Sequence, residues 1–237
     1  LDVCDIPALV RLFEGYRPDS VIHLAARTSA SASWVDPAAD AYVNILGTIG
    51  VMQASISVST VKRITFASSA AVYGDSIDTP AKEDVTPLEP ISPYGLSKLT
   101  GERYLSMYGR SGLCSISILR FSNVYGPRQR VAGEAAVVPA FIGALSKNEP
   151  VVITGNGTQT RDFVYVEDVV DAIVRSLSVH GNLVCNISSD SSVDILRLCE
   201  MLRGMIVSTS HLEFVAERAG EIRHSRLSNM RATDILG

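Results

Sequence analysis

The sequence lacks the marks of nucleic-acid-binding and membrane-spanning proteins. Its 237 residues contain 21 Lys and Arg against 25 Asp and Glu, a formal net charge of −4. A basic surface for nucleic acid is therefore not expected. No apolar run reaches the ~20 residues that a membrane-spanning helix needs. A composition of 46% hydrophobic and 19% charged residues predicts a soluble globular protein with a substantial core.

Paired cysteines are also missing. The chain has four cysteines, none in a C-x-x-C pair, so the pattern indicates neither a disulfide framework nor a zinc site, and we predict no metal site. We expect buried, reduced thiols at Cys4, Cys114, Cys185 and Cys199. Residues 1–5 carry no basic leader of the kind that begins a signal peptide. A reducing cytoplasm fits these observations.

Strand-like apolar runs alternate with helical patterns in the first half of the chain. We expect a buried strand that runs into a loop at 21–26, further strands at 63–69 and 115–120, and helices from 37 to about 57 and from 93 to about 108. Such alternation favours βαβ units and a parallel sheet. Ligands of these sheets bind at the carboxyl ends of the strands. Polar or small residues follow all three strands, at 23–26, 68–69 and 122–123.

The pattern changes after Gly126, where a polar loop begins. The later elements that we expect are a helix at 135–145, strands at 151–154 and 161–166, a helix at 169–179, and a helix, a strand and a helix between 193 and 237. No internal repeat or low-complexity linker separates the two parts. A second, smaller lobe woven into the first is the natural interpretation.

The most informative residues are Tyr94 and Lys98, which share one face of the expected helix because they stand at i and i+4. A lysine ammonium there stabilises a phenolate, which lowers the tyrosine pKa from its usual ~10. A serine hydroxyl from the upstream pair Ser68–Ser69 can hydrogen-bond the same substrate oxygen. Together these groups form a proton-transfer device for an alcohol being oxidised or a ketone being reduced.

Six stretches of the chain, taken in order, resemble a known family. They are VIHLAA at 21–26, NILGT at 44–48, ASSAAVYG at 67–74, SPYGLSK at 92–98, LRFSNVYGPRQ at 119–129 and GNGTQTRDFVYVED at 155–168. Together they resemble the extended short-chain dehydrogenase/reductases, and within them the nucleotide-sugar epimerase/dehydratase branch typified by UDP-glucose 4-epimerase. The match covers essentially the whole chain.

The resemblance implies an α/β fold: a Rossmann-like, doubly wound parallel sheet with a smaller, mixed α/β substrate-binding lobe. The nucleotide-binding domain is expected at 1–126 with parts of 155–185, and the lobe at 127–154 and 186–237. The implied cofactor is NAD, with NADP as the alternative, the substrate is a nucleotide sugar, and the assembly is a homodimer.

Members of the family begin with a strand, a G-x-x-G-x-x-G turn and a helix. We expect that unit, roughly fifty residues, to precede Leu1, and pyrophosphate binding depends on it.

The resemblance also implies a role for individual residues. Tyr94 is the expected acid/base, Lys98 its partner, and Ser69 the hydrogen-bonding group at the reacting oxygen. The expected cofactor contacts are Asp2, Val3, Leu24, Ala25, Ala26, Asn44, Ser68, Tyr94, Lys98 and Ser122. The expected substrate contacts are Ser69, Tyr94, Asn123, Arg161, Arg218 and Ser225. Guanidinium groups suit a diphosphate, whereas the lone His23 on a buried strand is interpreted as structural.

Two alanines guide the choice within the family. Dehydratases of this branch carry an acidic pair after the serine, where this chain has Ala70 and Ala71, and alanine cannot move protons. The prediction is therefore a 4-epimerase acting through a 4-keto sugar. A 4-ketoreductase, a dehydratase and a catalytically silent relative remain the alternatives.

Ser225 replaces a bulky residue of hexose-restricted members, which favours acceptance of N-acetylated sugars. For a dimer, the expected surface lies on the Tyr94 helix, at Leu99, Tyr104 and Leu105.

Overall fold

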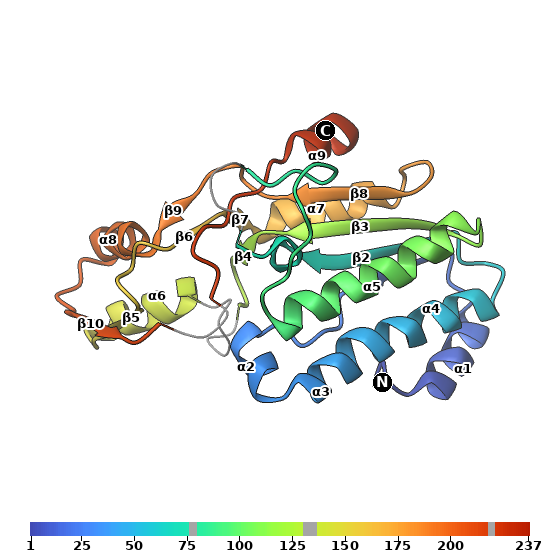
Figure 1. Ribbon diagram of the computed structural model, residues 1–237, viewed down its shortest axis with the longest axis horizontal. Helices are drawn as coiled ribbons and strands as arrows, with labels where there is room; N and C mark the ends of the chain where they lie inside the picture. Colours follow the sequence, from blue (N-terminus) through green and yellow to red (C-terminus); the bar gives the residue numbers. More distant parts are fainter. Residues whose placement is uncertain (76–79, 130–136, 218–220) are drawn as a thin grey trace.

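The computed structural model describes residues 1–75, 80–129, 137–217 and 221–237 (Figure 1). The helices are α1 (Ile6–Tyr16), α2 (Ala30–Val35), α3 (Pro37–Ala41), the π-helical η1 (Tyr42–Leu46), α4 (Gly47–Ser57), the 3₁₀ turn η2 (Ala70–Tyr73), α5 (Pro93–Arg110), α6 (Val137–Lys147), α7 (Val166–Ser176), α8 (Ile195–Ile206) and α9 (Met230–Leu236). The strands are β1 (Ser20–His23), β2 (Arg63–Ser69), β3 (Ser115–Phe121), β4 (Asn123–Tyr125), β5 (Val151–Thr154), β6 (Thr160–Arg161), β7 (Phe163–Tyr165), β8 (Leu183–Ile187), β9 (Val193–Asp194) and β10 (Leu212–Val215).

Four strands form a parallel sheet in the order β1-β2-β3-β8. Figure 1 shows α4 and α5 against one face of this sheet and α7 on the other. Residues along β2 alternate between these faces. Ile64 and Phe66 join a buried core with side chains of α1, α4 and α5, whereas the Thr65 hydroxyl hydrogen-bonds the Ser176 hydroxyl of α7. The expected α/β, doubly wound arrangement is confirmed.

The first strand differs from expectation. Residues 21–26 were predicted to be a buried strand that runs into a loop. β1 ends at His23, as such a strand would, but the side chains of Ile22 and Leu24 are 43% and 54% exposed. Among the described strands β1 pairs with β2 alone, so it is the outermost strand of the described sheet on that side. Residues 24–26 form part of the connection that follows it.

The helix expected from 37 to about 57 is present as α3, η1 and α4 in succession. Its middle is one π-helical turn, a feature that is frequent at functional sites. The helix that carries Tyr94 begins as its sequence predicts: Ser92 caps it by accepting from the Gly95 amide, and Pro93 opens the first turn. A Cβ at Gly95 would lie 2.5 Å from the Ala71 carbonyl oxygen, so glycine allows α5 to approach η2 closely.

Three two-stranded sheets form the remaining part of the chain: β5 with β10, β4 with β7, and β6 with β9. α6 and α8 pack on β5 around a second core that includes Phe141, Leu145, Ile153 and Ile195. The strand expected at 161–166 is interrupted at Asp162, whose carboxylate accepts from the backbone amides of Ser189 and Leu227.

The helix expected at 135–145 is α6; its first expected residues, 135–136, lie outside the described residues. α9 packs against α7 and β8 of the main sheet, although we assigned it to the smaller lobe. The division of the chain into two domains remains a prediction. No helix in the described ranges is long and apolar enough to cross a membrane.

The surface proposed for dimerisation needs a correction. Leu105 is fully buried in the core beneath α5, and Leu99 packs partly buried against the cluster around η2. Leucine at those two positions faces inward because α5 lies flat on the sheet. The exposed large apolar side chains of α5 are Leu96, Tyr104 and Met107.

Candidate active site

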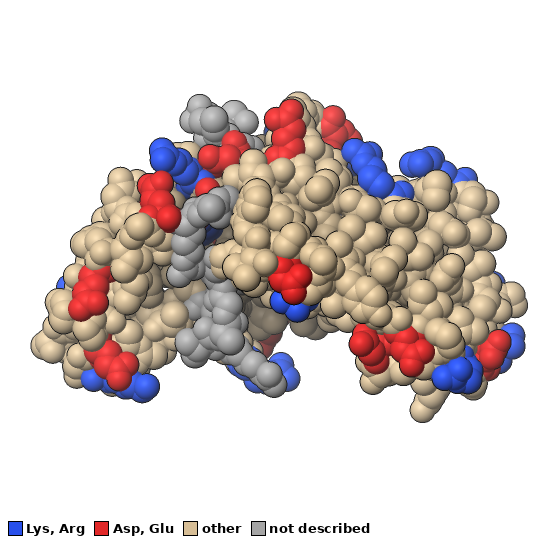
Figure 2. Space-filling model, turned by 60° about the horizontal axis from the view of Figure 1, so that its bottom comes forward, with Lys and Arg blue, Asp and Glu red and all other residues tan. Residues whose placement is uncertain are grey.

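A pocket of about 560 Å³ opens at the carboxyl ends of β2 and β3. Its walls come from the end of β2, η2, the start of α5, the β3–β4 connection, β6 and residues 221–225. In sequence order, the lining includes Thr28, Ser68, Ser69, Ala70, Ala71, Tyr94, Ser122, Asn123, Gln129, Arg161, Glu221 and Ser225. Figure 2 shows the surface hollowed between the part that carries α8 and the part that carries α1.

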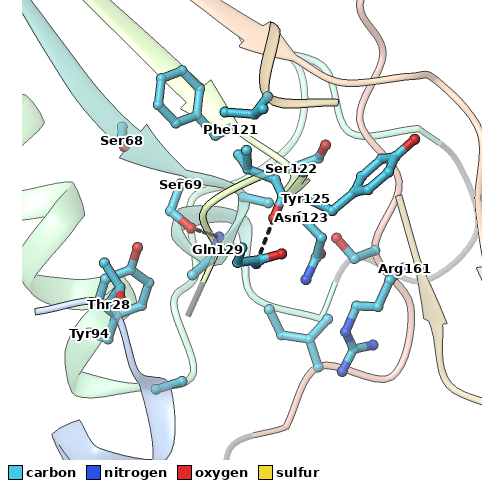
Figure 3. A pocket seen from close by; sticks show the side chains of 18 of the residues that line it. Thr28, Ser68, Ser69, Tyr94, Phe121, Ser122, Asn123, Tyr125, Gln129 and Arg161 are labelled. Atoms are coloured by element: carbon cyan, nitrogen blue, oxygen red, sulfur yellow. Dashed lines mark hydrogen bonds between the residues drawn. The ribbon is translucent and has the colours of Figure 1, made fainter. Parts of the chain in front are cut away.

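The expected residues lie along this pocket in a definite order. In Figure 3, the Tyr94 ring and Thr28 lie on one side and Arg161 on the other, with Ser69 and Asn123 between them. Tyr94 comes from the first turn of α5, and its backbone amide donates to the Ser33 hydroxyl of α2 (3.0 Å). The Tyr94 and Ser69 side chains both line the pocket, so the phenol and the serine face the same space.

The predicted effect of Lys98 on Tyr94 is wrong for this state of the molecule. The pKa of Tyr94 is raised above its usual value, chiefly by burial; the hydrogen bond from Ser69 opposes that shift and the charge of Asp40 adds to it. The Lys98 ammonium instead donates to the Ala67 carbonyl (2.8 Å) and lies 4.8 Å from the Phe66 ring centre. Burial also lowers the pKa of Lys98 to about 8, although Asp40 and Glu102 favour its charged form.

The two serines at the end of β2 have different partners. The Ser69 hydroxyl accepts from the Ala71 amide (3.2 Å) and lines the pocket. The buried Ser68 hydroxyl also reaches the pocket wall, but it donates to the Glu102 carboxylate. Glu102 in turn holds the Arg120 guanidinium in a two-pronged ion pair at 2.7 and 2.9 Å. The Ser69 hydroxyl therefore faces the pocket, whereas Ser68 belongs to a buried network.

Asn44 and His23 are both buried and hydrogen-bonded. The Asn44 side chain accepts from the Arg27 amide and donates to the Arg27 carbonyl and the Ser97 hydroxyl, so it ties the segment after β1 to α5. The His23 ring hydrogen-bonds the Thr48 hydroxyl (3.0 Å). Burial, with a smaller contribution from the Lys98 charge, lowers the pKa of His23 to about 4. A neutral histidine with such partners suits a structural role.

The other expected cofactor residues are spread over a wider area. Ser68 and Ser122 line the pocket. Leu24, Ala25 and Ala26 follow β1 at the same sheet edge, outside the pocket wall. Asp2 accepts from the Cys4 amide, and Val3 packs on the core near α4. The side chains of Leu24 and Ala25 are exposed, and their contact with a cofactor remains a prediction.

The far end of the pocket carries the arginine expected for phosphate binding. The Arg161 guanidinium pairs with the Glu221 carboxylate (3.2 Å), and their side chains are 14% and 26% exposed. Asn123 and Ser225 line the same pocket. Arg218 lies outside the described residues. Glu221 also lines a smaller adjoining hollow of about 120 Å³, together with Thr154, Gln159 and His224.

Sequence reasoning missed several residues of this site. Thr28, Gln129 and Glu221 line the pocket, and Glu102 and Asp40 place negative charge near Lys98. Glu102 could have been found, because it stands four residues after Lys98 on the same helix face. Asp40 comes from a different helix, so no local spacing pointed to it.

The model of the NAD dependent epimerase/dehydratase family matches residues 1–187. The chain belongs to this family. Its NAD dependence agrees with the cofactor that the sequence predicts. Family members that the chain is similar to include the UDP-glucose 4-epimerase of Mycolicibacterium smegmatis, 37% identical over 230 residues that make up 97% of this chain and 73% of that protein.

Two further relatives show the spread of the family. The dTDP-D-glucose 4,6-dehydratase of Bos taurus is 34% identical over 210 residues, 88% of this chain and 58% of that protein. The crystal structure of Thermus thermophilus UDP-glucose 4-epimerase in complex with NAD superimposes with a TM-score of 0.94 at 31% identity, over 99% of this chain and 76% of that one. Both 4-epimerases and 4,6-dehydratases thus resemble this chain, and the site chemistry must separate them.

Proposed function

We propose that this protein is a NAD-dependent 4-epimerase of a UDP-hexose or UDP-N-acetylhexosamine that acts through a 4-keto sugar. The observation that carries the proposal is the meeting of Tyr94 and Ser69 on one side of the pocket, beside two alanines. Epimerisation at C4 needs one group that takes and returns a proton, and a pocket in which the sugar can turn.

Tyr94 is the proposed proton carrier. As a phenolate it removes the proton from the sugar 4-hydroxyl while C4 becomes a carbonyl, and as a phenol it returns that proton when C4 is reduced. Ser69 hydrogen-bonds the same oxygen in both states, since its hydroxyl both donates and accepts. NAD, when bound, supplies the acceptor for the C4 hydride and, in its cationic oxidised form, a positive charge that favours the phenolate.

Lys98 is proposed to act from beneath the pocket. Its ammonium is held by the Ala67 carbonyl at the end of β2, the strand that also carries Ser69. From α5 it contributes positive charge and a donor on the side where the nicotinamide ribose is expected. Leu24, Ala25 and Ala26, which follow β1, and Asn44 of η1 are proposed to complete the cofactor side.

Arg161 and Asn123 are proposed to hold the substrate diphosphate at the other end. A partly exposed guanidinium, such as that of Arg161 paired with Glu221, can exchange a carboxylate for phosphate oxygens. Arg218 is proposed to assist. The smaller hollow, which Glu221 lines as well as the main pocket, then offers room for the ribose or base of the nucleotide.

Ala70 and Ala71 support epimerisation over dehydration. Both line the pocket next to Ser69, at the positions where dehydratases of the family carry acid and base. Removal of water from C5 and C6 requires groups that move protons there, and a methyl group cannot do so. Ser225 lines the pocket and is small, which supports acceptance of an acetamido sugar.

A homodimer is proposed to form through the exposed apolar side chains of α5, with Tyr42 and Leu46 of the neighbouring η1. The exposed residues lie along one side of two adjacent helices, as in a helix-to-helix interface. Size-exclusion chromatography with light scattering tests this assembly.

Product analysis tests the proposed reaction. The native protein is incubated with NAD and UDP-glucose that carries deuterium at C4. The expected product is UDP-galactose with the deuterium retained, without net consumption of nicotinamide. A product lighter by one water would establish a dehydratase. Stoichiometric consumption of a reduced nicotinamide by a 4-keto sugar, without epimer formation, would establish a ketoreductase. No turnover of any UDP-hexose or UDP-N-acetylhexosamine would overturn the proposal.

A further inference from the structure

Asp40 is a buried carboxylate that the proposed reaction does not use. It lies in α3 with only 1% of its surface exposed. Its Oδ1 accepts from the Asn44 amide (3.1 Å), one helical turn later. Its Oδ2 is also buried, and no donor among the described residues hydrogen-bonds it. A buried carboxylate with one unbonded oxygen is costly, so its position calls for a reason.

The surroundings of Asp40 contain the two central residues of the site. α3 packs against α5, and the Asp40 charge acts on both Tyr94 and Lys98. Asn44 links the two helices further, since the same amide that donates to Asp40 also donates to Ser97 (3.1 Å), next to Lys98. Asp40 is thus linked to α5 through Asn44.

Asp40 and Glu102 both favour the charged form of Lys98, but they differ in the other charges that they already balance. Glu102 holds Arg120 through both of its oxygens, so that pair is already neutral. His23 of β1, the other titratable group near Lys98, is neutral at physiological pH because burial lowers its pKa to about 4. Asp40 is the carboxylate left to balance the Lys98 ammonium, and a buried cation needs such a counter-charge.

We propose that Asp40 is a positioning residue: its buried carboxylate, held by Asn44 on a helix that packs against α5, is the counter-charge of the Lys98 ammonium and sets the charge balance around Tyr94. The role rests on the proposed function of Tyr94 and Lys98. Asp40 touches neither substrate nor reacting atoms. It acts through the two residues of α5.

The direction of the effect follows from the sign of the charge. A negative charge disfavours the phenolate of Tyr94 and favours the ammonium of Lys98, so it raises the pKa of both groups. Asp40→Asn keeps the shape and an acceptor for Asn44 but removes the charge. Both pKa values should then fall. Any limb of the pH profile that reports the protonation of Tyr94 or of Lys98 should therefore move toward acid.

The first measurement needs no turnover. Tyrosinate formation is titrated by ultraviolet difference spectroscopy in the native protein, and the Tyr94 signal is isolated by subtracting the titration of Tyr94→Phe. We expect the Tyr94 midpoint in Asp40→Asn to lie lower by about one pH unit, a tenfold change in proton affinity. Asp36→Asn is the matched control: it removes an exposed carboxylate from the same helix and keeps the N-cap, so the midpoint should not move.

The second measurement is the pH profile of kcat/KM for the proposed epimerisation. In Asp40→Asn any limb that reports Tyr94 or Lys98 should move to lower pH, whereas a merely structural defect would lower the whole profile without moving its limbs. If Asp40→Asn fails to fold, Asp40→Ser removes the same charge and retains an oxygen. An unmoved Tyr94 midpoint in a folded variant would overturn the role of Asp40, whatever the reaction proves to be. Absence of epimerase activity with a shifted midpoint would instead overturn the proposed function alone.

Discussion

The two ends of the pocket hold their charges in opposite ways. At the Tyr94 end, Glu102, Arg120 and Lys98 are buried, and each has partners within the fold. At the other end, Arg161 pairs with the Glu221 carboxylate at 3.2 Å and stays partly exposed. Proton transfer requires a pKa that the surroundings fix, whereas phosphate binding requires a charge that a ligand can reach. The contrast implies that substitutions at the first end affect folding, and those at the second end affect binding.

The largest expected effect on stability comes from breaking the buried pair. Glu102→Gln should lower the free energy of unfolding by about 3–5 kcal/mol, because Arg120 loses its counter-charge inside the protein. Chemical denaturation of wild type and variant measures the loss. Asp171→Asn is the control, since it removes a solvent-exposed i,i+4 partner of Arg175 and should cost only about 0.5 kcal/mol. Equal losses would show that burial does not distinguish the two pairs.

The dependence of the unfolding free energy on pH, in the acid range, tests the buried groups at the Tyr94 end of the pocket. The pKa of His23 is lowered to about 4 in the folded protein, so below its ordinary value of 6.5 the unfolded chain binds a proton that the folded chain does not. Stability should therefore fall as pH falls from about 6.5 to about 4, by up to about 3 kcal/mol from this residue. His23→Gln should flatten that decline in denaturation curves taken at several pH values. The exposed His211→Gln should leave it unchanged, and an undiminished decline in the His23 variant would refute the assignment.

Much of the Tyr94 end could be predicted because its signals are local. The i, i+4 spacing placed Tyr94 and Lys98 on one helix face, and that helix was expected to begin at Pro93, as it does. The environment of Lys98 could not be predicted, because Asp40 and Phe66 reach it from other elements. The pKa of Tyr94 was misjudged for the same reason: burial is a property of the packed structure. The break at Asp162 likewise depends on amides from distant segments.

At the Arg161 end of the pocket, a substitution should change the affinity for a ligand more than the stability of the fold. Arg161→Ala should weaken binding of UDP by about 1.5–3 kcal/mol, the range for a hydrogen bond to a charged group. Its unfolding free energy should change by less than about 1 kcal/mol, since the partly exposed Glu221 left behind remains hydrated. Titration calorimetry and denaturation measure the two quantities. Arg226→Ala, which removes an arginine paired with Asp190 outside the pocket wall, should leave UDP affinity intact; a matching loss there would deny Arg161 a specific role.

The smallest expected effect concerns the choice of sugar. Ser225→Tyr should reduce the turnover of UDP-N-acetylglucosamine relative to UDP-glucose by about tenfold, because the larger side chain enters the pocket where an acetamido group would lie. Assays of both sugars on wild type and variant give the ratio. A wild-type enzyme that accepts UDP-glucose only would contradict the predicted tolerance before any substitution is made.

The central claim is that Tyr94 carries the proton. Tyr94→Phe keeps the ring and removes only the hydroxyl that faces Ser69. The account predicts that this variant binds NAD and UDP as tightly as the wild type while its turnover of UDP-glucose falls by ~10²–10⁴-fold, the usual contribution of a positioned acid/base. Turnover within a factor of about two of the wild type would contradict it.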